Sequence, residues 1–368
     1  MKTSEIKKRL TPATAERRLT ANAFVTAPGV WRLKDIFVNV FIIQDLDSPD
    51  WVLVDAGLKT TANRLRKLVA ELFGSSASLP KAIVLTHAHF DHRGSLEALA
   101  TEWGVPVYAH RQELPYLQGK AHYPPADPSV GGGMMATLSF VYPKKPVHFT
   151  GDLQELPADG SIPQLKDWRW IHTPGHTPGH ISLYRDADGV LIAGDAITTT
   201  LAESALSTAT QAKILSGPPK YFTPDWGAAA RSVRELAQLK PAVIATGHGQ
   251  TLYGKEQAQA LNHLARTFWQ KGMPAKGRYV QEPAQFDDQG VATYIPPARG
   301  YFAARLITAA ALLTIGYLLY RKSKNGNFVE RKASEKLGKS LISGSLQALG
   351  ASAPAIPALP ALPVIPAL

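Results

Sequence analysis

The sequence predicts an α/β fold in which two β-sheets pack face to face and helices cover their outer faces. Short β-like runs alternate with amphipathic helical segments along residues 21–297. The alternation occurs in two comparable halves of the chain. Because a sheet must bury its apolar face against another layer, such a pattern favours two facing sheets with helices outside.

The first half predicts a β-meander followed by a β-α-β unit. The meander consists of three β-like runs, at residues 30–33, 37–43 and 51–57. Apolar residues at helical spacing predict a helix over 60–73, which Gly74 ends, and a buried strand follows at 81–86. A further helix and strand are expected at 95–103 and 105–109. Residues 121–147 are rich in Pro and Gly and predict a mobile loop.

The second half repeats the scheme. We expect strands at residues 168–172, 181–185, 190–193 and 242–246. Helices are expected at residues 224–239, which begin with Pro and Asp, and at 254–271. The two halves together form the predicted catalytic domain, residues 21–297.

Charge is distributed unevenly along the 368 residues, whose formal net charge is +11. Residues 1–20 carry six Lys/Arg against two Glu, and residues 298–368 carry nine against two. Residues 21–297 therefore carry 25 charges of each sign, so this region has no overall field that would attract nucleic acid. The chain contains no Cys, so any metal site must use imidazole and carboxylate ligands.

The two ends of the chain differ in composition from the rest. The basic extension 1–20 has no apolar stretch typical of a signal peptide, so we expect a cytoplasmic catalytic domain. Residues 301–320 are apolar on all sides and long enough to span a bilayer, which predicts a membrane-anchoring helix. A buried or dimerising helix is the alternative. Residues 321–368 are basic and then Ala/Pro-rich, and are predicted to be disordered.

Residues 86–92, THAHFDH, are the strongest chemical motif in the sequence. They follow a predicted strand, where alternate residues face the same way, so His87 and His89 can meet one metal. The turn that follows would aim Asp91 and His92 at a second metal.

A two-metal site needs further ligands, and three candidates lie beside glycines at later strand ends: His176, Asp195 and His248. Three His with a bridging Asp195 would complete one site. Asp91, His92, His248 and the shared Asp195 would complete the other. All seven ligands are N or O donors, which suits two Zn²⁺ per chain, with Fe or Mn as alternatives.

These motifs resemble those of the metallo-β-lactamase superfamily, and within it the hydrolases similar to glyoxalase II and to lactonases. The matching stretches are VDAG at 54–57, THAHFDH at 86–92, TPGHTPGH at 173–180, GD at 194–195 and GHG at 247–249. The resemblance implies an αββα sandwich and makes His176 the ligand of its motif. It also implies that Asp55 lies beside the metals as a non-ligand that organises the ligands.

Departures from known subfamilies narrow this interpretation. The absence of Cys excludes β-lactamases with a Cys ligand, and those without one lack a bridging Asp where this chain has Asp195. Flavodiiron proteins of this superfamily carry Glu where this chain has His89, which argues against oxygen reduction. Glyoxalase II adds a helical C-terminal domain, whereas one convincing helix follows His248 here.

Other histidines and one tyrosine have structural interpretations. His172 is expected to be packed or exposed, and His180 to fix a turn by hydrogen bonding. His110 is either structural or close to the ligands. His122 and Tyr123 lie in the Pro/Gly-rich loop, where the choice is between solvent exposure and contact with substrate.

The sequence therefore predicts a zinc-dependent hydrolase of a small ester, thioester or lactone, in which Asp91 orients a metal-bound hydroxide. The expected partners are a small-molecule substrate and, through 301–320, a membrane. Two alternatives stay open. One is a phosphodiesterase or nuclease with a similar His/Asp set, although no nucleic-acid partner is expected from the charge. The other is a membrane-tethered module with a structural metal.

Overall fold

The computed structural model describes residues 13–74, 79–143, 147–298, 314–315 and 317–318. The chain divides into two units, Met1–Arg299 and Gly300–Leu368. The described positions of the second unit are helical. The predicted apolar helix and the Ala/Pro-rich tail lie otherwise outside the described residues. No helix within the described ranges is both long enough and apolar enough to cross a bilayer.

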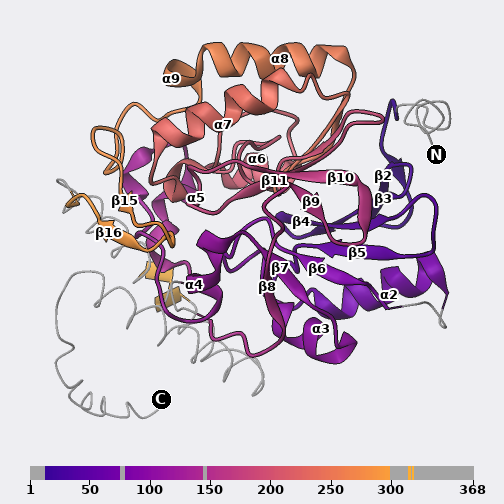
Figure 1. Ribbon diagram of the computed structural model, residues 1–368. Coiled ribbons are helices and arrows are strands. Elements are labelled where there is room, and N and C mark those ends of the chain that lie inside the picture. The colour runs from indigo at the N-terminus through magenta and orange to yellow at the C-terminus, as the bar shows by residue number, and fades with distance from the viewer. Residues whose placement is uncertain (1–12, 75–78, 144–146, 299–313, 316, 319–368) are drawn as a thin grey trace, which may run out of the picture. The chain divides into compact units, whose positions relative to one another are not determined.

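The first half of the unit Met1–Arg299 forms an eight-stranded mixed sheet (Figure 1). In spatial order its strands are β1 (Arg17–Arg18), β2 (Ala23–Ala27), β3 (Val30–Asp35), β4 (Val38–Gln44), β5 (Trp51–Val54), β6 (Ala82–Val84), β7 (Val107–Ala109) and β8 (Leu153–Glu155). Strands β1 to β5 pair antiparallel, and β5 to β8 pair parallel.

The second half forms a six-stranded sheet in which only β12 and β13 pair parallel. In spatial order its strands are β14 (Leu252–Tyr253), β13 (Val243–Ala245), β12 (Val190–Ile192), β11 (Ile181–Arg185), β10 (Leu165–His172) and β9 (Ser161–Ile162). A separate hairpin consists of β15 (Gln285–Phe286) and β16 (Ala292–Tyr294).

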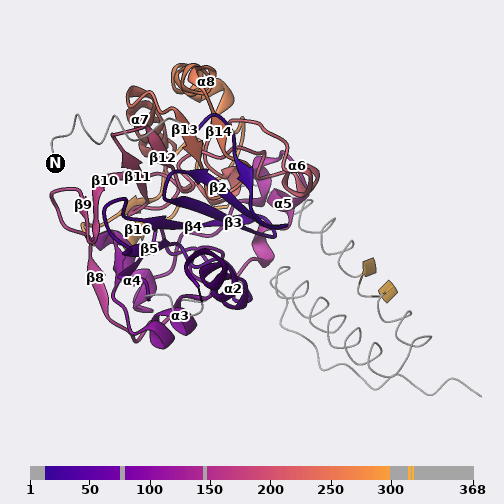
Figure 2. The ribbon, with the colours of Figure 1, turned by 90° about the vertical axis from the view of Figure 1, so that its right-hand side faces the viewer.

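Helices cover both outer faces, so the domain has four layers (Figures 1 and 2). The α-helices are α2 (Ala62–Phe73), α3 (Leu96–Trp103), α4 (Leu114–Leu117), α5 (Met134–Thr137), α6 (Ala205–Thr210), α7 (Trp226–Gln238), α8 (Lys255–Arg266) and α9 (Phe268–Lys271). The predicted helix 254–271 is therefore two helices, with Thr267 between them.

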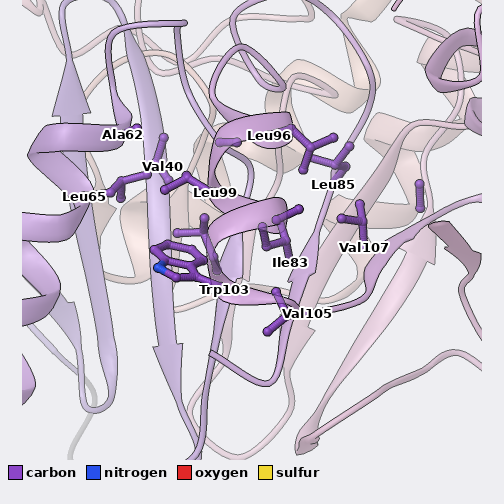
Figure 3. Close-up of a cluster of buried hydrophobic side chains, with 14 of the residues drawn as sticks. Val40, Ala62, Leu65, Ile83, Leu85, Leu96, Leu99, Trp103, Val105 and Val107 are labelled. Atoms are coloured by element: carbon purple, nitrogen blue, oxygen red, sulfur yellow. The ribbon is translucent and has the colours of Figure 1, made fainter. Parts of the chain in front are cut away.

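Strand β4 shows why the sheets stack. Its alternate residues Phe41 and Ile43 join the core between the two sheets, where they meet residues of β10 to β13. Val40 and Ile42 point the other way, into a core shared with α2 and α3, which Figure 3 shows around Leu65, Leu99 and Trp103. A strand buried on both faces has a nearly continuous run of apolar residues, and in β4 only Asn39 interrupts the run from Val38 to Ile43. Helices α7 and α8 close a third core on the far face.

The segment 121–147, predicted to be a mobile loop, contains three short helical turns: α5 and the 3₁₀ turns Pro128–Val130 and Ser139–Val141. The prediction missed them because turns of three or four residues have no periodicity to detect. Ala136 of α5 packs against Ala202 and Tyr221, so later parts of the chain hold this segment.

Candidate metal centre

The predicted site residues follow the ends of five strands. Asp55 follows β5 and the THAHFDH motif follows β6, while His176 follows β10. Asp195 follows β12 and His248 follows β13. Because β5 and β6 are parallel, as are β12 and β13, the carboxyl ends within each pair lie at the same edge of their sheet.

All seven predicted ligands are buried and come together there. They form three overlapping groups whose donor atoms lie within 4.8 Å of one another: His87, His89 and His176; His87, His92 and Asp195; Asp91, His92 and His248.

Asp195 lies in the middle of this cluster. Its Oδ2 is 3.0 Å from Nε2 of His248 and 3.5 Å from Nε2 of His176, and its Oδ1 is 3.6 Å from Nε2 of His92. Nε2 of His248 also lies 3.6 Å from Oδ2 of Asp91. The arrangement thus places one carboxylate between the histidines of both predicted metal positions.

The cluster fits divalent metals by a test internal to the structure. Three buried atoms of the cluster, His87 Nε2, His92 Nε2 and Asp195 Oδ1, have no hydrogen-bond partner in the described part of the chain, while Nε2 of His176 lies 2.9 Å from Nδ1 of His89. Unsatisfied buried polar atoms are costly. Imidazole and carboxylate donors that converge without partners are the environment that a metal ion satisfies.

Asp55 contacts the first motif and is not a member of these three donor groups. Its Oδ2 lies 2.8 Å from Nδ1 of His92, and its Oδ1 accepts a hydrogen bond from the Thr86 backbone N–H at 2.8 Å. Such a carboxylate fixes the ring orientation of a ligating histidine and leaves the other ring nitrogen for the metal. The left-handed backbone of Asp55, with φ of 63°, turns its side chain toward the motif.

The histidines around His176 divide as expected. Both ring nitrogens of His180 are used, because Nδ1 lies 2.9 Å from Thr173 Oγ1 and Nε2 accepts from the Asp195 backbone N–H at 2.8 Å. Nε2 of His172 lies 2.8 Å from the Pro178 carbonyl oxygen, and its ring stacks on that of His110. His180 therefore braces the loop of Asp195, and His172 is packed away from the cluster.

Comparison with known proteins identifies the family. The family model described as the metallo-beta-lactamase superfamily matches residues 33–248, more than half of the chain. This chain belongs to the metallo-β-lactamase superfamily. The match confirms the superfamily predicted from the motifs, while the branch similar to glyoxalase II stays a prediction.

Two curated relatives and one solved structure are similar to this chain. The chain is 45% identical over 243 residues to the probable metallo-hydrolase YflN of Bacillus subtilis. The matched region covers 66% of this chain and 92% of YflN. The chain is 28% identical over 221 residues to the probable metallo-hydrolase YybB of the same organism, covering 60% of this chain and 84% of YybB. A solved structure, the BLEG-1 B3 metallo-beta-lactamase, is 25% identical, covers 62% of this chain and 94% of its own, and has a TM-score of 0.44.

Burial and neighbouring charges set the protonation of this superfamily site. Burial lowers the pKa of His89 to about 3, and it lowers the pKa of His87 and His176 well below the usual value. These three imidazoles are therefore neutral, which is the form that binds metal. Burial also acts on His92, but Asp195 and Asp55 overcome it and raise the pKa of His92 well above the usual value.

Glu113 is a buried residue beside the site that the sequence analysis missed. It ends a 3₁₀ turn after β7, and burial raises its pKa to about 7 against the effect of four hydrogen-bond donors. Tyr123, for which exposure and substrate contact were the alternatives, is half-buried and donates a hydrogen bond to Glu113. His122 is exposed. No motif marks Glu113, because its partners are distant in sequence.

A pocket lies beside the cluster of predicted ligands. Its lining is mostly apolar or aromatic and includes four of these ligands. It comprises Phe37, His89, Phe90, Asp91, Met135, Tyr142, Asp195, Pro219, Tyr221, Phe222 and His248. Phe222 stacks on His89 with ring centres 4.7 Å apart. Among the described residues, this lining includes no Lys or Arg.

Proposed function

We propose that this metallo-β-lactamase superfamily member is a hydrolase of small esters, thioesters or lactones that uses two Zn²⁺ ions. The observation that carries the proposal is the position of Asp195 between the histidines, 3.0 Å from His248 and 3.5 Å from His176. A carboxylate shared in this way supports a pair of metals, whereas a structural zinc site is usually closed and four-coordinate.

The ligands are assigned to two positions that share Asp195. His87, His89 and His176 would hold one ion, and Asp91, His92 and His248 the other. The unsatisfied atoms of His87, His92 and Asp195 support this assignment, as does the position of His176 Nε2, 3.5 Å from Asp195 Oδ2. The absence of Cys from the chain and the all-N/O donor set favour zinc, with iron or manganese as alternatives.

The metals, when bound, supply a water of lowered pKa as the nucleophile and a Lewis acid for the carbonyl oxygen. The residues of the chain position the reaction. Asp91 lines the pocket and, as a carboxylate, accepts a hydrogen bond from the attacking water and so orients it. Asp55 and His180 keep His92 and Asp195 in place through the hydrogen bonds described above.

The pocket supports an uncharged substrate group. Phe37, Phe90, Tyr142, Tyr221 and Phe222 offer apolar surface, and the described lining has no Lys or Arg side chain that would bind a phosphate. A carboxylic ester, thioester or lactone fits this lining better than a phosphodiester does. We place the enzyme in the branch similar to glyoxalase II and lactonases on the motifs, and we propose that residues 301–320 anchor a cytoplasmic catalytic domain to a membrane.

The test is a hydrolysis screen of the full-length protein loaded with Zn²⁺, on matched thioesters, lactones, carboxylic esters and phosphodiesters. We expect two metals per chain, turnover of at least one carboxylic substrate class, and loss of both one metal and activity in Asp195→Ala. Faster phosphodiester hydrolysis would favour the nuclease alternative. A single metal with no turnover would favour a structural metal site.

A further inference from the structure

A single buried carboxylate, that of Glu113, contacts both loops that carry the first group of histidines. Its Oε2 accepts a hydrogen bond from the Ala88 backbone N–H at 2.9 Å and another from the Tyr123 hydroxyl. Its Oε1 accepts from Thr177 Oγ1 at 2.7 Å and from the Gly179 backbone N–H at 2.9 Å. These four donors are uncharged, so hydrogen bonds rather than an ion pair compensate for the burial of this carboxylate.

These donors are next to the proposed ligands in the chain. Ala88 lies between His87 and His89, and Thr177 directly follows His176. The two loops come from different sheets, since one follows β6 and the other follows β10. The carboxylate is thus a cross-link between the sheets at the point where their histidines meet.

The fit around this cross-link is tight. A Cβ on Gly179 would lie 2.8 Å from Cγ of Glu113 and 2.9 Å from its backbone nitrogen, so the second loop approaches Glu113 as closely as a glycine allows. Tyr123 strengthens the first loop, because its hydroxyl also accepts from Ala88 N–H at 3.0 Å while its ring lies 4.5 Å from that of His89.

We propose that Glu113, with Tyr123, is a positioning residue that sets the separation of the two histidine loops and thereby the affinity and geometry of the metal position formed by His87, His89 and His176. The proposal rests on the proposed function, because it takes these histidines as ligands. Glu113 touches no ligand side chain in the hydrogen bonds that the structure gives it, and it acts through backbone and hydroxyl groups on either side of the ligands.

Glu113→Gln is the sharpest variant because it keeps the size of the side chain. The amide replaces one carboxylate oxygen with an NH₂ group, which cannot accept hydrogen bonds. The two donors that face this group lose their acceptor, so one of the two loops loses its hydrogen bonds to residue 113. Residues that support metal ligands typically account for 10–100-fold in metal affinity. We expect a loss of that size at the first metal position, and a smaller one in Tyr123→Phe, which removes one hydroxyl.

The experiment measures Co²⁺ binding to the full-length protein by chelator competition and records the visible spectrum of the bound ion, which reports ligand geometry. The reference variants are His176→Ala, which lacks a ligand of the first position, and His248→Ala, which lacks one of the second. We expect Glu113→Gln to alter the bands that His176→Ala alters and to leave unchanged those that depend on His248.

The matched control is Asp127→Asn. Asp127 is also a buried carboxylate that accepts from uncharged donors, the backbone N–H groups of Ser129 and Arg278 and the Ser129 hydroxyl, but none of these adjoins a proposed ligand. Its replacement should lower stability without changing the Co²⁺ spectrum. If Glu113→Gln behaves like this control, with wild-type affinity and spectrum, the proposal is wrong and Glu113 only stabilises the fold.

Two further outcomes are decisive. If Glu113→Gln does not fold, Tyr123→Phe decides, and unchanged Co²⁺ affinity in that variant overturns the proposal. If the wild-type protein binds two ions but hydrolyses none of the screened substrates, the proposed activity fails while the Co²⁺ measurements still judge the role of Glu113.

Discussion

Gly247 lies against Asp195 so closely that a Cβ on Gly247 would be 2.1 Å from Asp195 Oδ1 and 2.7 Å from Cε1 of His92. Backbone hydrogen bonds fix this approach, since Gly247 N–H donates to the Gly194 carbonyl at 2.8 Å and Gly247 O accepts from Asn39 N–H at 2.8 Å. The loops after β12 and β13 therefore meet at a point where no side chain fits, and the central carboxylate of the cluster lies there.

Gly247→Ala should displace Asp195 or His92 and reduce both metal content and activity. The reason is steric, because a contact of 2.1 Å is far shorter than any that real Cβ atoms make, so the neighbouring group must move. Metal content per chain, measured after dialysis, checks the prediction. The control is Gly227→Ala in α7, where the nearest atom to a new Cβ lies at 3.3 Å and alanine favours the helix. A metal-replete Gly247→Ala protein would contradict the argument.

Alanine substitutions of the three histidines in residues 172–180 should distinguish the metal ligand from the histidines that are not ligands. His176→Ala should lose one metal and activity, because His176 belongs to a donor group and its Nε2 lies 3.5 Å from Asp195 Oδ2. His180→Ala removes the acceptor of the Asp195 N–H and should lower metal affinity about 10–100-fold, with recovery in excess zinc. His172→Ala should be close to wild type, since His172 contacts Pro178 and His110. Zinc titrations of the three variants test the order.

Much of the fold follows from local patterns. Residues 37–43 are apolar apart from Asn39, which is typical of a strand buried on both faces, and β4 occupies Val38–Gln44. Helix α2 ends at the glycine expected to end it. The short strands β8 and β9 escaped prediction because two or three residues carry no alternation to detect.

The residues of the site also differ in whether a local sequence pattern predicts them. The seven predicted ligands were recognisable because their spacing and glycine neighbours are local, and all seven meet in one cluster. Glu113 was not recognisable, since it joins Ala88 to Thr177 across 25 and 64 residues of sequence. Only the stacking of two sheets brings these segments together, and no local pattern encodes that contact.

The apolar segment 301–320 should hold the full-length protein on membranes. About 20 apolar residues span a hydrocarbon core of about 30 Å. Full-length protein should therefore sediment with membranes and resist carbonate extraction, whereas a chain that ends at Pro297 should stay in the supernatant with its metal content unchanged. Equal partition of the two proteins would leave the buried or dimerising helix as the explanation of this segment.

Acid should destabilise the metal-free protein, starting below about pH 6.5, because its buried histidines resist protonation. Burial lowers the pKa of His89 to about 3 and lowers the pKa of His87 and His176 well below the usual value. A group whose pKa is lower in the folded than in the unfolded chain contributes stability above its unfolded pKa and loses it as the pH falls toward the folded value. In this window the unfolded chain protonates these histidines and the folded chain does not. Glu113, whose pKa burial raises to about 7, takes up a proton in the folded chain alone and so offsets the effect of about one histidine.

Below about pH 6.5, each such histidine should lower the free energy of unfolding by up to about 1.4 kcal/mol for every unit by which the pH falls. His92 and His248 do not cancel this slope, because their raised pKa values make their contribution complete once the pH is below about 6.5. Urea unfolding of chelator-treated protein at pH 7.5, 6.5 and 5.5 measures the slope directly. His89→Asn should reduce the slope of the free energy of unfolding against pH by the contribution of about one proton. A free energy of unfolding that stays constant down to pH 5.5 would show that these imidazoles are protonated in the folded chain.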